Sequence, residues 1–223
     1  MLYVDTDTFF VADPAPLLCQ LARGTALMHQ PEYTFEQAVA QYAAFGQVHY
    51  PQRFLQLLAT RTFEIDGQQW QFQGSQRGWN SGVLGLPPAV ARLLPAVYAL
   101  TDAFYAGSGW FTSEQLAFSL ALPTRFPLER SDSHLFHYWG QGQKKLLDHK
   151  LTDLLAPPFS QLSLPARLAR VLPLTSRWRR QAEVDRLQEG ALYALGRGRL
   201  LPGAKYAVKA LLKAPSTGSF SSS

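Results

Sequence analysis

Strand-like and helix-like segments alternate through the first 140 residues of this 223-residue chain, and this alternation limits the folds that it can adopt. Strand-like sequence occupies residues 2–4 and 8–11, on either side of an acidic pair, and residues 61–74, 79–86 and 133–140. Apolar residues with helical spacing fill residues 34–60, 88–106 and 112–122. Such alternation favours a layered α/β domain, in which helices cover a sheet. The length is sufficient for a substantial hydrophobic core.

Local signals refine this pattern at two places. Residues 61–74 alternate apolar and polar side chains about Asp66-Gly67, which predicts a hairpin with a tight turn. The segment ADPAPL, residues 12–17, predicts a turn that leads into a short helix, with Asp13 as its capping residue.

The chain changes character after about residue 150. From Arg167 to Lys213 it has eleven lysines and arginines but only three acidic residues. Such a segment suits an anionic membrane surface, a phosphorylated ligand or nucleic acid, or is simply a solvated helical surface. We therefore predict a domain over residues 1–150, a helical basic region over residues 151–213, and a disordered tail over residues 214–223.

Several features bear on cellular location. Cys19 is the single cysteine, so no disulfide can form within the chain, which fits a reducing compartment. No secretion-signal pattern and no apolar run of about 18 residues is present. These features predict a cytoplasmic protein. Residues 206–213 form a basic amphipathic helix that we expect to pack against the domain; the alternative is peripheral docking on the inner face of a membrane.

The opening sequence MLYVDTDTFF places two carboxylates, Asp5 and Asp7, in an otherwise hydrophobic segment. If one strand continues through them, both side chains point to the same face. Two adjacent carboxylates repel each other and resist burial, and a divalent cation would relieve both costs. Carboxylate ligands suit Mg²⁺ or Mn²⁺. The alternative for such a pair is two solvated acids at a turn.

Together with three later motifs, this segment resembles GT-A fold glycosyltransferases, particularly the group that contains glycogenin and bacterial lipopolysaccharide galactosyl- and glucosyltransferases. The matching stretches cover about residues 1–145 and keep the family's order. They are YVDTDTFFVADPAPLL (3–18), WNSGVLGL (79–86), SEQLAF (113–118) and HLFHYWG (134–140).

The resemblance implies a set of site residues. Asp5, Asp7 and His137 would bind Mn²⁺ or Mg²⁺ against the diphosphate of a nucleotide-sugar donor. Asn80 and Gln115 would orient the sugar and stabilise charge as the glycosidic bond opens. After Gly140, Lys144 or Lys145 would contact a phosphate, although Lys144 stands one residue later than the family pattern has it. The acceptor would be a glycan, a glycolipid or a protein, and nucleic acid is not an expected partner.

The chain departs from the family in two further respects. Glu114-Gln115 stands where the family most often has Asp-Gln. Roughly a hundred residues of nucleotide-binding βαβ structure normally precede the metal-binding strand in the family. We therefore expect the α/β domain to be the second half of a GT-A mixed sheet with helices, truncated at its N-terminus, with a helical basic appendage. Such a chain would lack the part that holds the base and ribose, and need not be active alone.

Two alternatives from other classes stay open. The sequence Asp-Thr-Asp-Thr at residues 5–8 also resembles the first motif of haloacid-dehalogenase-type phosphatases, in which Asp5 would be the nucleophile and Asp7 the general acid and base. That family needs a later acidic pair, whereas Asp132 is isolated. The second alternative is a non-catalytic binding module, in which the carboxylates only cap a turn.

Overall fold

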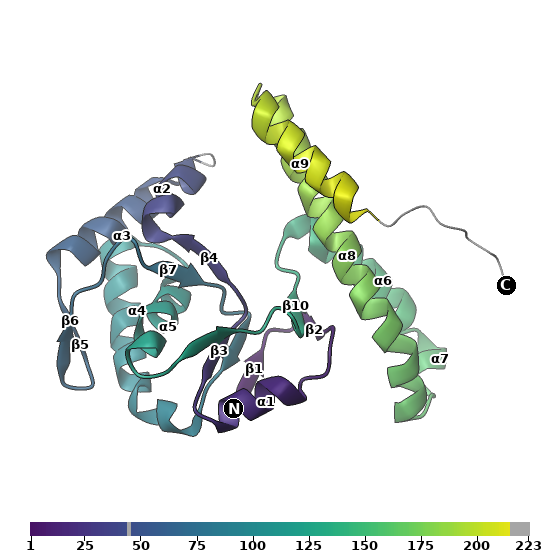
Figure 1. Ribbon diagram of the computed structural model, residues 1–223, viewed down its shortest axis with the longest axis horizontal. Coiled ribbons are helices and arrows are strands. Elements are labelled where there is room, and N and C mark those ends of the chain that lie inside the picture. The colour runs from purple at the N-terminus through teal and green to yellow at the C-terminus, as the bar shows by residue number, and fades with distance from the viewer. Residues whose placement is uncertain (44–45, 215–223) are drawn as a thin grey trace. The chain divides into compact units, whose positions relative to one another are not determined.

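The computed structural model describes residues 1–43 and 46–214. Most of the predicted tail, residues 215–223, lies outside the described residues. The chain forms two compact units (Figure 1). Unit 1 contains residues 1–8 and 12–137, and unit 2 contains residues 9–11 and 138–223.

Unit 1 is mixed α/β and is organised by a four-stranded sheet with the order β1-β8-β3-β9. These strands are β1 (Leu2–Val4), β8 (Val83–Gly85), β3 (Ala26–Met28) and β9 (Leu128–Arg130). β8 runs antiparallel to both β1 and β3, whereas β9 runs parallel to β3. Every residue of β3 and β8 is buried, as expected for central strands.

The remaining strands of the chain are also short. β4 (Pro31–Thr34) pairs with β7 (Arg77–Trp79), and β5 (Phe63–Ile65) pairs with β6 (Gln68–Trp70). The β5–β6 turn is the predicted hairpin, with Asp66 at φ 52° and Gly67 at φ 74°, the left-handed geometry that a two-residue turn requires. The last two strands are β2 (Thr8–Phe10) and β10 (Leu135–His137).

Helices surround these strands in unit 1 (Figure 1). They are α1 (Ala15–Ala22), α2 (Phe35–Ala43), α3 (His49–Thr60), η1 (Pro88–Arg92), α4 (Leu94–Ser108), α5 (Ser113–Ala121) and η2 (Leu122–Thr124). Asp13, the predicted capping residue, lies one position before the N-cap residue Pro14, and its Oδ1 accepts a hydrogen bond from the Ala15 N–H at the start of α1 at 2.9 Å. Seven of the nine α5 residues are buried, so this helix runs through the interior of unit 1.

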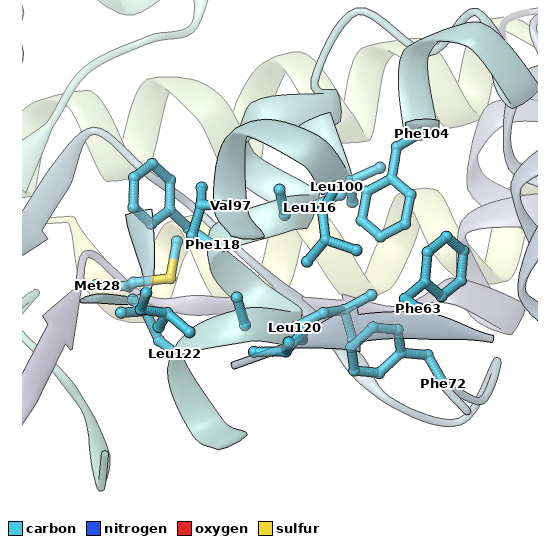
Figure 2. Close-up of a cluster of buried hydrophobic side chains, with 14 of the residues drawn as sticks. Met28, Phe63, Phe72, Val97, Leu100, Phe104, Leu116, Phe118, Leu120 and Leu122 are labelled. Carbon is cyan, nitrogen blue, oxygen red and sulfur yellow. The ribbon is translucent and has the colours of Figure 1, made fainter. Parts of the chain in front are cut away.

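The core of unit 1 combines aromatic and aliphatic side chains (Figure 2). The Phe104 ring meets the Phe54 and Phe63 rings edge-on at centroid distances of 5.0 and 5.3 Å. Leu116, Leu120 and Leu122 extend the cluster. Edge-to-face packing of large rings stabilises a core beyond the burial of their area. This core fixes the elements that carry the candidate site.

Unit 2 is helical, with α6 (Gln141–Leu154), α7 (Pro157–Ser160), α8 (Leu164–Gly196) and α9 (Leu200–Lys213). α8 and α9 lie side by side as an antiparallel hairpin (Figure 1). Lys213 at the end of α9 forms an ion pair with Glu183 at 2.6 Å, and the Tyr206 ring packs over Gly190. No helix within the described residues has both the length and the apolar character needed to cross a membrane.

Candidate metal centre

Asp5 and Asp7 lie in the turn that follows β1. β1 ends at Val4, and the Asp5 N–H donates to the Gly82 carbonyl at 3.0 Å, which ties this turn to the start of β8. The acidic pair thus interrupts the strand, as the sequence indicated, and one strand does not continue through both residues. The turn nevertheless brings both of them toward His137, the last residue of β10.

One ligand atom from each of Asp5, Asp7 and His137 lies within 4.8 Å of the others. Nε2 of His137 is 3.2 Å from Oδ1 of Asp7 and 3.8 Å from Oδ2 of Asp5. Two carboxylate oxygens and one imidazole nitrogen form a donor set that can hold a divalent metal ion. The structure thus brings together the three metal ligands that the sequence resemblance implied.

Asn80 holds the imidazole of His137 in an orientation that suits a ligand. Oδ1 of Asn80 lies 2.7 Å from Nδ1 of His137 and also accepts the Gly82 N–H at 3.1 Å. Because a backbone N–H can only donate, the shared Asn80 atom is the oxygen, and Nδ1 of His137 must carry a proton. In the neutral ring, the lone pair is then on Nε2, which faces the carboxylates.

Gly82 provides the space that the imidazole occupies. A Cβ atom on residue 82 would lie 2.1 Å from Nδ1 of His137, far inside any contact distance. On its other side, the His137 ring meets the His29 ring edge-on at a centroid distance of 5.6 Å. The ring is 8 % exposed, so its position is set by packing as well as by its hydrogen bond to Asn80.

Glu32 on β4 is a site residue that the sequence analysis missed. Its Oε1 accepts from Nδ2 of Asn80 at 3.3 Å, and its Oε2 accepts from Nε2 of Gln115 at 3.2 Å. Burial raises the pKa of the Glu32 carboxyl, and the two amide hydrogen bonds counteract only part of that increase. The only sequence signal was an acidic residue inside the strand-like, aromatic segment PEYTF.

Gln115, in the first turn of α5, is fixed at both ends of its side chain. Nε2 donates to Glu32, and Oε1 accepts from the N–H and the hydroxyl of Ser81 at 3.3 and 3.4 Å. The predicted residues Asn80 and Gln115 therefore belong to one hydrogen-bonded network, joined by Glu32. Through Asn80 this network reaches His137.

The predicted phosphate contacts, Gly140, Lys144 and Lys145, belong to unit 2. Gly140 immediately precedes α6, and its carbonyl accepts the Lys144 N–H at 2.8 Å. Their role at a phosphate stays a prediction.

Comparisons with known proteins identify no family. A scan against protein-family models, a search of curated proteins and a search of solved structures each returned no match.

Proposed function

We propose that this chain provides the metal-binding part of a GT-A-type glycosyltransferase, which transfers a sugar from a nucleotide-diphosphate donor to a glycan, glycolipid or protein acceptor. One observation carries the proposal: Asp5, Asp7 and His137 converge, and a single hydrogen-bonded network joins His137 to Asn80, Glu32 and Gln115. These residues come from five separate stretches of the chain. The mixed sheet, whose strand β1 leads directly into the acidic turn, is compatible with this class.

Asp5, Asp7 and His137 would hold Mn²⁺ or Mg²⁺. A divalent ion at such a site supplies Lewis-acid stabilisation of the diphosphate leaving group. Asp5 and Asp7 contribute two negative charges that favour a cation, and His137 offers the neutral Nε2 lone pair. A histidine as third ligand also favours this class over the phosphatase alternative, which would need a further carboxylate.

The amide side chains have distinct roles in the proposal. Asn80 is 6 % exposed and its oxygen and nitrogen are both engaged within the protein, so it acts as a positioning residue for His137 and Glu32. Gln115 is half-buried and is held rigidly by Glu32 and Ser81, so it presents a fixed polar edge to the sugar. Preorganised polar groups of this kind stabilise developing charge without reorganisation.

Calorimetric titration of UDP into the full chain, with and without Mn²⁺, tests the proposal. We expect UDP binding that requires Mn²⁺ and is lost in Asp7→Asn, because that change removes a charged ligand oxygen. Asp102→Asn, an exposed change of equal charge on α4, should leave binding intact. Mn²⁺-independent binding, or full binding by Asp7→Asn, would contradict the proposal. A folded wild-type chain that binds neither Mn²⁺ nor UDP would favour the non-catalytic alternative.

A further inference from the structure

Helix α9 exposes several large apolar side chains instead of burying them. Leu201 is 86 %, Leu212 81 % and Leu211 76 % exposed, and Leu200 and Val208 are also exposed. Single exposed leucines are common on protein surfaces, but contiguous apolar patches mark contact sites. Five such residues within one 14-residue helix form an apolar patch, which indicates a contact surface.

The exposed patch is distinct from the face of α9 that packs on α8. Gly203 and Ala210 are the buried residues of α9, and Gly203 lies directly against the Leu195 side chain of α8. At about 100° per residue, Leu200, Leu201, Val208, Leu211 and Leu212 share an arc of about 120° that contains neither Gly203 nor Ala210. The hairpin therefore stabilises α9 and leaves this leucine arc outward.

A row of lysines borders the leucine arc. Lys205 and Lys209 are exposed, lie one helical turn apart, and line a surface depression together with Leu201, Pro202 and Tyr206. α9 contains no acidic residue, and Arg197 and Arg199 immediately precede it. Lys213 is the exception in this row, because it is paired with Glu183. An apolar arc beside unneutralised lysines is the pattern of a helix that lies in a membrane interface.

We propose that α9 docks on the surface of an anionic phospholipid membrane, with the leucine arc at the acyl boundary and Lys205 and Lys209 at the lipid phosphates. This inference does not rest on the proposed glycosyltransferase activity, since every residue involved belongs to unit 2. The α8–α9 hairpin holds the helix in place before docking, so folding of the helix need not accompany binding.

The charge distribution favours this occupant over two others. A second copy of the chain would bring Lys205 and Lys209 against like charges. Nucleic acid would engage the lysines but would leave the leucine arc in water. An anionic bilayer accommodates the leucine arc at its acyl boundary and the lysines at its phosphates. Basic residues and buried apolar area both contribute to interfacial binding.

Vesicle flotation of the full chain tests the proposal, with phosphatidylcholine vesicles compared with vesicles that also contain phosphatidylglycerol. We expect binding to the anionic vesicles that weakens with added salt. Both Leu201→Ser/Leu212→Ser and Lys205→Glu/Lys209→Glu should reduce that binding about tenfold or more. Two control pairs should retain vesicle binding. Leu18→Ser/Leu155→Ser removes exposed leucines outside α9, and Arg53→Glu/Arg92→Glu reverses exposed positive charges outside α9.

The competing outcomes are distinct. Absence of flotation with anionic vesicles would overturn the proposal, as would equal losses in the control pairs. Vesicle-independent dimerisation that Leu201→Ser/Leu212→Ser abolishes, seen by light scattering without any flotation, would assign the arc to a second copy instead. Helix content measured by circular dichroism confirms that each variant is folded. UDP titration of the same variants separates a failure here from a failure of the metal-centre proposal.

Discussion

Each unit of the molecule withdraws one glutamate from water, and the pKa values of these two glutamates move in opposite directions. In unit 1, Glu32 accepts hydrogen bonds from the neutral amides of Asn80 and Gln115, and burial raises its pKa. In unit 2, burial also acts to raise the pKa of Glu183, but Lys213 and Arg179 outweigh burial and lower it.

The difference shows what each unit is organised around. Unit 1 surrounds its carboxylate with the oriented amide dipoles of Asn80 and Gln115, beside a core of aliphatic and aromatic side chains. Unit 2 compensates its carboxylate with the full positive charges of Arg179 and Lys213, on two helices that also expose several leucines. Fixed dipoles suit a site for chemistry, whereas surface charge beside exposed apolar area suits contact with a partner.

The largest expected effect comes from Glu32→Ala. This change leaves the side-chain amides of Asn80 and Gln115 without their acceptor, and we expect it to lower the free energy of unfolding by about 2–3 kcal/mol. Glu183→Ala should cost about 1 kcal/mol or less, because its partners Lys213 and Arg179 can turn to water. Urea unfolding measures both changes. Glu64→Ala, at an exposed position on β5, serves as the control. A loss of unfolding free energy in Glu64→Ala as large as in Glu32→Ala would contradict the special role of Glu32.

Asn80→Ala tests whether the network of unit 1 extends to the metal centre. Without Oδ1 of Asn80, the imidazole of His137 loses the partner that fixes its tautomer and orientation. We expect affinity for Mn²⁺ to fall by about 10–100-fold, measured by calorimetry with the metal alone. Gln69→Ala, an exposed change on β6, should leave affinity unchanged. Unchanged affinity in folded Asn80→Ala would separate the network from the metal centre.

A smaller effect distinguishes the two glutamates by pH. The ordinary pKa of a glutamate is 4.5, and the pKa of Glu32 is raised above it in the folded protein. Just above pH 4.5, the folded protein therefore still holds a proton on Glu32 that the unfolded chain has released. The contribution of Glu32 to stability consequently falls as pH rises through its raised pKa. Glu183 has a lowered pKa in the folded protein. Its contribution to stability is therefore fully present above pH 4.5 and is lost as pH falls through the lowered pKa.

Unfolding curves across acidic pH, for wild type, Glu32→Gln and Glu183→Gln, give the measurement. The stability difference between wild type and Glu32→Gln should shift in favour of the variant as pH rises. The difference for Glu183→Gln should shift in favour of wild type. Slopes of the same sign would refute the contrast between the two units.

The sequence predicted part of the site. Asp5, Asp7 and His137 converge, and the acidic pair separates β1 from β2, as the interrupted hydrophobic segment indicated. Short-range signals were sufficient for the Asp66-Gly67 turn, whose backbone geometry depends on those two residues alone. The helical spacing over residues 34–60 corresponds to two helices, α2 and α3.

Glu32 could not be predicted because its environment is made by distant parts of the chain. Its partners Asn80 and Gln115 are 48 and 83 positions away. In sequence, a glutamate on a four-residue strand is indistinguishable from a solvated surface acid. Only the assembled fold buries it and supplies two amide donors, so no local pattern could have identified its role.

The close approach of His137 to Gly82 has a consequence for the evolution of this chain. Any side chain at position 82 would compete with the imidazole for the same volume. Descendants that keep the histidine should therefore keep the glycine, even though residue 82 offers no ligand atom. Lineages that lose the histidine should be free to accumulate larger residues at position 82. We expect these two positions to covary, and an aligned set of related chains would record that dependence as a correlated pair 55 residues apart.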